Sequence, residues 1–187
     1  MKDTLKKPEV MAPVGSFAAL TAAIEAGANS VYFGVQQLNM RARSAANFTL
    51  DDLREIAKTC NDAGVRTYLT VNTVLYDHDL TLMRAIIDTA KEANVTAIIA
   101  QDMAAILYAN KIGMTIHIST QLSISNYEGV KFYSQFADTI VLAREVDLDS
   151  IAAICKKIKE EDLRGPAGEL VKIEIFVHGA LCIAQSG

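Results

Sequence analysis

The carboxyl-terminal stretch of the chain concentrates residue types that carry chemistry in enzymes. It starts as an apolar strand and ends in a histidine, a glycine and a cysteine, reading Glu174, Ile175, Phe176, Val177, His178, Gly179, Ala180, Leu181, Cys182. Parallel α/β proteins usually hold their active sites at the carboxyl ends of the strands. We therefore expect Glu174 and His178 to be catalytic groups. Cys182 is expected near the mouth of the site, as a nucleophile, a metal ligand or an inert thiol.

Polar side chains also stand at or near the ends of other predicted strands. Because these strands are apolar and parallel, their polar ends are expected to face one mouth, where buried polar groups must find partners. The further catalytic candidates are Asn72, His117, Gln121, Arg144 and Glu145, and the substrate-binding candidates are Arg41, Arg43, Gln101 and Asp102. The arginines suit an anionic group, since a guanidinium forms bidentate hydrogen bonds with carboxylates and phosphates.

Several candidates have an equally simple structural interpretation. Asp102 can cap the helix that follows it, and His117 can be a core histidine bonded to a backbone carbonyl. Arg144 beside Glu145 can form a structural ion pair. The sequence alone leaves these alternatives open.

The spacing of residues disfavours three kinds of site. No His-x-His or His-x-x-x-His pair is present to bind a metal ion. Lys172 stands at the start of its predicted strand, whereas Schiff-base chemistry needs a lysine near the carboxyl end. No Gly-x-Ser-x-Gly turn marks a serine nucleophile. Four thiolates usually hold an iron–sulfur cluster, and the three cysteines, Cys60, Cys155 and Cys182, lie far apart in the sequence.

The elements that must position these residues alternate along the chain. Strands are predicted at 10–12, 30–35, 66–74, 95–100, 114–119, 139–143 and 171–177, and helices at 17–26, 49–63, 77–93, 103–111, 126–136 and 150–161. The strands are apolar throughout, which is typical of a parallel sheet covered by helices. We expect an α/β fold, an incomplete TIM-barrel-like (β/α)8 barrel with about seven parallel strands.

The predicted barrel occupies residues 1–187 as a single domain, truncated at its carboxyl end. A complete barrel needs roughly 200 to 250 residues or more. The rival fold is an open doubly wound sheet. It is disfavoured because the first strand is not followed by a Gly-x-Gly-x-x-Gly turn.

Composition limits the class of protein. The chain of 187 residues is 51% hydrophobic, enough for a sizeable core, and its net charge of −4 disfavours broad attraction to nucleic acid. No apolar run approaches the roughly 18 residues of a membrane helix, and residues 1–10 lack an apolar signal core. We expect a cytoplasmic protein without a membrane partner.

An ordered set of motifs resembles the U-32 peptidase family, the collagenase-like proteins. The motifs cover essentially the whole chain: residues 11–16, 26–28, 31–34, 39–42, 72–73, 101–102, 117–121 and 141–145, then Glu174-x-Phe176-x-x-Gly179-Ala180-Leu181-Cys182 and Gly187. Each motif is short, and their common order carries the resemblance.

The resemblance implies one of two enzymatic activities. Some members of the family are described as collagen-degrading peptidases. Others resemble iron–sulfur proteins for oxygen-independent hydroxylation of bases in tRNA or rRNA, or of the ubiquinone precursor ring, and in these four cysteines hold the cluster. Cys182 matches the first of the four. The implied substrate is therefore RNA, a small aromatic ring or a peptide. A noncatalytic RNA-binding or assembly module is a third interpretation.

The same resemblance makes the chain look like an amino-terminal fragment. The next family cysteine would come two residues after Gly187, so we expect an iron–sulfur cluster only in the full-length protein and none in this fragment. We expect the fragment to be inactive and to self-associate through the open edges of its barrel.

Overall fold

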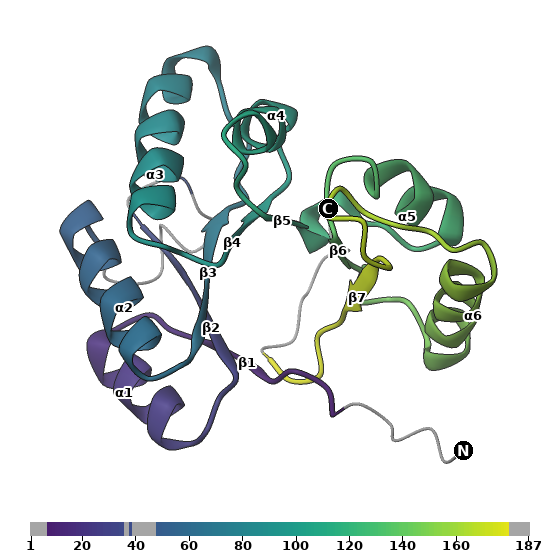
Figure 1. Ribbon diagram of the computed structural model, residues 1–187, viewed down its shortest axis with the longest axis horizontal. Coiled ribbons are helices and arrows are strands. Elements are labelled where there is room, and N and C mark those ends of the chain that lie inside the picture. Colours follow the sequence, from purple (N-terminus) through teal and green to yellow (C-terminus); the bar gives the residue numbers. More distant parts are fainter. Residues whose placement is uncertain (1–6, 36–37, 39–47, 180–187) are drawn as a thin grey trace.

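The computed structural model describes residues 7–35, 38 and 48–179, and its strands form one parallel sheet. The strands are β1 (Met11–Pro13), β2 (Ser30–Gly34), β3 (Arg66–Val71), β4 (Ala97–Ala100), β5 (Ile116–Ile118), β6 (Thr139–Val141) and β7 (Lys172–Glu174). They pair in sequence order, β1 to β7, and each is parallel to its neighbour. The sheet curls into a half-barrel with the helices on its outside (Figure 1). The prediction of an incomplete TIM-barrel-like fold is confirmed.

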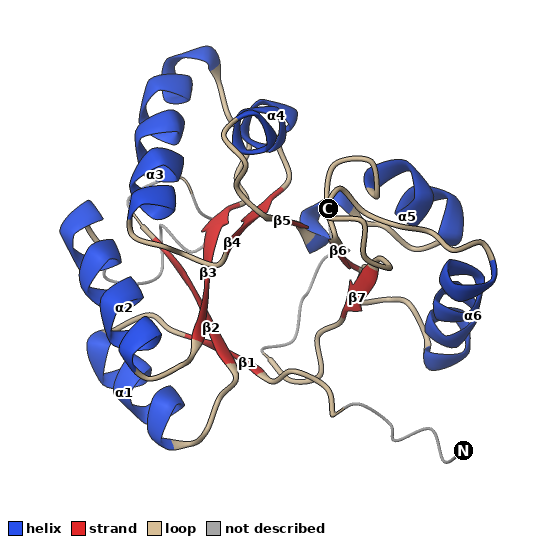
Figure 2. Cartoon of the chain, in the orientation of Figure 1, coloured by secondary structure: helices blue, strands red, loops and turns tan. Residues whose placement is uncertain are grey.

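Six α-helices connect the strands and cover the outer face of the sheet (Figure 2). They are α1 (Phe17–Glu25), α2 (Leu50–Asp62), α3 (Leu80–Glu92), α4 (Met103–Lys111), α5 (Tyr127–Tyr133) and α6 (Leu148–Glu160). Two short 3-10 turns, η1 (Asp77–Asp79) and η2 (Thr120–Leu122), precede α3 and α5. Within the described ranges, every helix is too short or too polar to span a bilayer.

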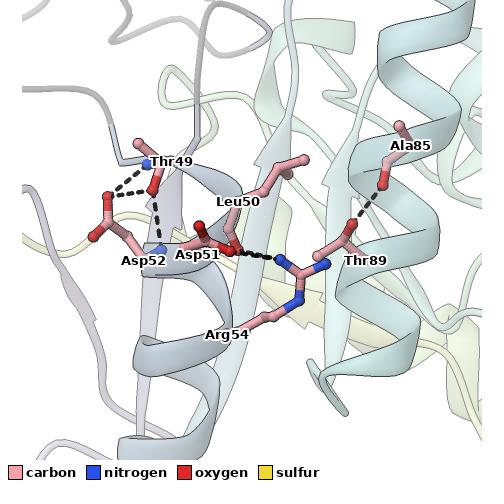
Figure 3. Close-up of polar contacts among 7 residues, drawn as sticks. All are labelled: Thr49, Leu50, Asp51, Asp52, Arg54, Ala85 and Thr89. Atoms are coloured by element: carbon pink, nitrogen blue, oxygen red, sulfur yellow. Dashed lines mark hydrogen bonds and ion pairs between the residues drawn. The ribbon is translucent and has the colours of Figure 1, made fainter.

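The start of α2 follows directly from its sequence. Thr49 accepts a hydrogen bond from the backbone N–H of Asp52, and the Asp52 carboxylate accepts one from the backbone N–H of Thr49 (Figure 3). This capping box satisfies amide groups that the first turn would otherwise leave without a partner. Leu53, Ile56 and Cys60 then recur at helical spacing and are completely buried.

Tight turns end the helices and return the chain to the sheet. Gly64 follows α2 with a φ of 68°, a conformation that glycine adopts without steric cost. Asn94 occupies the corresponding place after α3 with a φ of 57°. Asparagine tolerates this left-handed region better than most side chains, so both crossovers can be short.

The main hydrophobic core lies between the sheet and the helices. Alternate strand residues such as Leu69, Ile98 and Ile118 point outward into it, and they meet helix residues such as Ile56 and Ile106. The opposite side chains of the strands face the concave side of the sheet, which we call the lumen. A smaller apolar cluster of Tyr68, Ala97 and Ile99 lies there, joined by Met11 and Tyr32. The period of two along each strand thus separates the packing face from the lumen.

The last strand is shorter than predicted. The pattern 171–177 indicated seven residues, whereas β7 comprises Lys172–Glu174. Its one described neighbour, β6, is itself only three residues long, so the backbone beyond Glu174 has little to pair with. Phe176 and Val177 are therefore exposed loop residues.

Candidate active site

The structure brings two predicted site residues into direct contact in the lumen. His117 is the central residue of β5 and Glu174 is the last residue of β7. The His117 Nδ1 atom lies 2.9 Å from the Glu174 Oε2 atom, and the two side chains are only 10% and 23% exposed. Thr139 and Val141 on β6 pair with His117 and Glu174, and their short side chains let the pair form across that strand.

The tautomer of His117 follows from this contact. An ionised carboxylate can only accept hydrogen bonds, so the contact with Glu174 favours the tautomer of His117 that carries its hydrogen on Nδ1. In the neutral ring, Nε2 then holds a lone pair and can accept a proton or a hydrogen bond. A carboxylate that orients a histidine in this way is a recurring arrangement in acid–base catalysis.

An aromatic side chain that the sequence analysis missed forms one wall of the site. The Tyr68 ring lies against the His117 ring, with 4.6 Å between centroids and an interplanar angle of 39°. The two residues come from β3 and β5, and Ala97 on the intervening strand pairs with Tyr68. The small alanine leaves room for the two rings to meet. The alternation of side chains along β3 places Tyr68 and Thr70 on the same face of the sheet. This alternation is the sequence feature from which the position of Tyr68 could have been predicted.

Glu9, which precedes β1, holds Tyr68 in place. The Tyr68 hydroxyl donates a hydrogen bond of 2.9 Å to Glu9, and Arg66 lies 2.8 Å from the other oxygen of that carboxylate. Burial and the nearby Glu9 charge raise the pKa of Tyr68 far above its usual value, so the phenol stays protonated at neutral pH. Nothing in the local sequence around Glu9 indicated this role, because the contact joins residues 59 positions apart.

A cavity of about 210 Å³ opens beside His117 and Tyr68. Most of its lining belongs to the starts of strands: Arg66, Thr96, Ala97, Thr115, Asp138, Thr139, Ala167, Glu169 and Lys172 complete it. The cavity therefore lies toward the amino ends of the strands, away from the mouth predicted from the carboxyl ends. It has room for several water molecules, each of which takes about 30 Å³.

The predicted residues at the carboxyl ends have varied surroundings. Asp102 caps α4, because its carboxylate accepts a hydrogen bond of 2.8 Å from the backbone of Ala104. The Arg144 guanidinium lies 4.7 Å from the centre of the Phe176 ring, a cation–π contact between the chain after β6 and the chain after β7.

The remaining candidates lie after strands or outside the described residues. Asn72 follows β3 and Gln101 follows β4, whereas Gln121 lies in η2 after β5. Glu145 and His178 are exposed in the segments after β6 and β7. Arg41, Arg43 and Cys182 lie outside the described residues.

The two described cysteines are poor candidates for a nucleophile or a metal ligand. Cys60 is completely buried on α2, and burial raises the pKa of its thiol to about 11. Burial also raises the pKa of Cys155 on α6. Among the described residues, no group of three or more histidine, cysteine or acidic side chains is arranged to hold a metal ion. This part of the chain does not supply the ligand set of an iron–sulfur cluster.

Comparison with known proteins gives a consistent result. The family profile described as Peptidase family U32 matches residues 15–187. The chain is 59% identical to a collagenase of Porphyromonas gingivalis, over 96% of this chain and 43% of the collagenase. It is 32% identical to tRNA hydroxylation protein P1 of Bacillus subtilis, over 97% of this chain and 41% of that protein.

A solved structure supports the same fold. The U32 peptidase Mk0906 superposes with a TM-score of 0.69 at 13% identity, covering 94% of this chain and 70% of that one. The chain thus spans less than half the length of the two curated relatives above and 70% of the solved Mk0906 chain.

Proposed function

Because the chain belongs to peptidase family U32, whose relatives carry the names of both collagenases and tRNA hydroxylation proteins, we propose that it forms part of an RNA-base hydroxylation protein. One observation carries the choice of this role over that of a Ser–His or Cys–His peptidase. In the described part of the chain, His117 is hydrogen-bonded to a carboxylate and to no serine or cysteine. A Ser–His or Cys–His peptidase needs its nucleophile within hydrogen-bond reach of the base. The pair instead suits acid–base work on a bound ring.

The lumen has the composition expected of a site for a planar substrate. Proteins that act on a nucleobase read its edge through hydrogen bonds and hold its face against aromatic or apolar side chains. Tyr68 supplies an aromatic ring, and the neighbouring His117 ring supplies a nitrogen that accepts a hydrogen bond. The surrounding Ala97 and Ile99 are apolar. The proposed substrate is a pyrimidine or purine base of tRNA, held in the full-length protein.

Cys182 is the residue of this chain that we propose as a ligand of an iron–sulfur cluster. When bound, such a cluster supplies electron-transfer chemistry. Cys182 would be one ligand, and the others would come from elsewhere in the full-length protein, since Cys60 and Cys155 do not fit. In a protein with this role we place the chain in the cytoplasm, where the RNA is modified.

The direct test is mass spectrometry of nucleosides from tRNA. Deletion of the complete gene in its host is expected to abolish one nucleoside that carries an extra oxygen atom. Expression of the wild-type gene restores it, whereas Cys182→Ala does not. The matched control is Cys155→Ala, which removes a partly exposed thiol on α6 and is expected to restore the nucleoside. Unchanged nucleosides in the deletion strain would contradict the proposal.

A collagenase-like peptidase is the second candidate, favoured by the 59% identity to a protein of that name. In this case the His117–Glu174 pair would activate a water molecule. Purified full-length protein would then release soluble peptides from collagen, and His117→Gln would abolish the release. Peptide release that persists in His117→Gln would show that the His117–Glu174 pair does not catalyse the cleavage.

A further inference from the structure

Four lumen side chains that contact one another in series come from the segment before β1 and from alternate strands. Glu9 precedes β1, Tyr68 lies on β3, His117 on β5 and Glu174 on β7. In (β/α)8 barrels, each layer of interior side chains is contributed by alternate strands. Such a layer needs no eighth strand. The contacts from Glu9 to Tyr68, from Tyr68 to His117 and from His117 to Glu174 run through it without a break.

Within this layer the imidazole is held on two sides. The Glu174 carboxylate lies within hydrogen-bond distance of Nδ1, and the Tyr68 ring packs against one face of the imidazole. The Tyr68 hydroxyl donates its hydrogen bond to Glu9 and not to His117. Among the described residues, Glu174 is the hydrogen-bond partner of the ring, which leaves Nε2 as the position where a ligand can bind.

We propose that His117 Nε2 is the hydrogen-bond and proton acceptor for an N–H or O–H group of the substrate, and that Glu174 is a positioning residue that holds the Nδ1–H tautomer. This inference deepens the proposed function, on which its choice of substrate rests: under that function the donor is an N–H group of a nucleobase. When a proton is transferred, the substrate N–H bond breaks, its electron pair stays on the nitrogen, and the proton binds Nε2. Glu174 then stabilises the imidazolium.

The tautomer makes the proposal measurable without any substrate. Free histidine favours the Nε2–H tautomer, so Nδ1–H in the protein requires a cause. The chain has three histidines, and the ring nitrogen signals of His117 can be assigned by their loss in His117→Gln. Nitrogen-15 NMR above the ordinary histidine pKa of about 6.5 is expected to give Nδ1–H for His117. His78 is the internal control: its side chain is 80% exposed and its Nε2 atom lies 3.6 Å from the Asp79 carboxylate, so it should show the Nε2–H tautomer.

Variants separate the role of Glu174 from general folding. Glu174→Leu is expected to return His117 to the Nε2–H tautomer, whereas Glu160→Leu, on the exposed surface of α6, should leave it unchanged. A wild-type protein with Nε2–H at His117 would overturn the proposal, even if Glu174→Leu failed to fold. Nδ1–H that persists in a folded Glu174→Leu variant would overturn the positioning role.

The use of this nitrogen is tested in the nucleoside assay. The initial rate of tRNA hydroxylation after induction of the full-length gene is expected to fall at least about tenfold in Glu174→Leu, and less in Glu174→Gln, whose amide oxygen can still accept from Nδ1–H. Full rates in both variants, with hydroxylation present in the wild type, would refute the inference and leave the proposed function standing. No hydroxylation in the wild type would refute the proposed function, while the NMR result would still decide the tautomer.

Discussion

At the scale of single residues, the lumen depends on contacts between positions far apart in sequence. His117 and Glu174 were both candidates from the sequence, because a histidine and a carboxylate stand out within apolar strands. Their pairing was not predictable, because 57 residues separate them and only the curl of the sheet brings them together. Tyr68 and Glu9 were missed for a different reason: neither lies at the carboxyl end of a strand.

The Tyr68–Glu9 hydrogen bond gives a prediction about stability. Tyr68→Phe removes the hydroxyl and leaves a half-buried carboxylate with one partner fewer. Hydrogen bonds to charged groups contribute roughly 1.5–3 kcal/mol, so we expect the free energy of unfolding to fall by about 2 kcal/mol in urea titrations. Tyr76→Phe is the matched control, since Tyr76 is 64% exposed. Equal stabilities of the two variants would show that the contact contributes nothing.

Thiol reactivity should distinguish the two described cysteines. Because burial raises the pKa of Cys60 to about 11 and excludes solvent, we expect a thiol reagent at pH 8 to modify Cys60 only at the rate of unfolding. Cys155, which is partly exposed, should react faster. Mass spectrometry of the labelled peptides measures both rates. Equal labelling of Cys60 and Cys155 in the folded protein would contradict the buried position of Cys60.

At the scale of elements, local sequence was most informative where a helix begins with a strong cap. Residues 103–111 were predicted as a helix and form α4 with both ends unchanged, since Asp102 caps its start. The strand predicted at 171–177 extended too far, because apolar residues alone do not reveal how long the neighbouring strand is. Strand length depends on a partner, whereas a helix makes its backbone hydrogen bonds within itself.

The capping box of α2 predicts a defined change. Thr49→Ala removes the side-chain acceptor for the Asp52 backbone, and substitutions of this kind cost about 1 kcal/mol. Thermal unfolding followed by circular dichroism is expected to show a lower midpoint. Thr21→Ala is the control, because Thr21 is exposed on α1 and its hydroxyl donates a hydrogen bond to the helix backbone at Phe17. A midpoint as low in the control as in Thr49→Ala would contradict the capping role.

The same box predicts how stability depends on pH. Hydrogen bonds from the Thr49 backbone and hydroxyl lower the pKa of Asp52 below its usual 3.8. The folded protein therefore holds this proton less tightly than the unfolded chain, so the contribution is present above pH 3.8 and is lost as the pH falls through the lower folded value. Acid titration of Asp52→Asn, which removes the titrating carboxyl group, should show a smaller loss of stability in this range. An unchanged acid dependence would exclude the box as its source.

At the scale of the whole molecule, the curled sheet has two strands with a neighbour on one side only among the described residues, β1 and β7. Exposed apolar residues accompany these edges: Val10, Ile175, Phe176 and Val177. Free strand edges and exposed apolar surface both favour association. We expect this chain to self-associate as its concentration rises.

Light scattering over a range of concentrations measures this association. Val177→Lys is expected to reduce it, because Val177 is 87% exposed next to β7. Leu148→Lys, at a position on α6 that is 76% exposed, is the control and should leave the association unchanged. A wild-type chain that remains monomeric at high concentration would contradict the prediction.

Under the proposed function, His117 in the lumen accepts a hydrogen bond or proton from a tRNA base during its hydroxylation. The measurement that tests it most directly is the initial rate of tRNA nucleoside hydroxylation in the deletion strain, rescued by the full-length gene carrying His117→Gln. General acid–base groups contribute about a hundredfold or more to rate, so the variant should lose at least that factor, while Tyr76→Phe keeps the wild-type rate. A His117→Gln strain that hydroxylates tRNA as fast as the wild type would show that His117 is not the acceptor in this reaction.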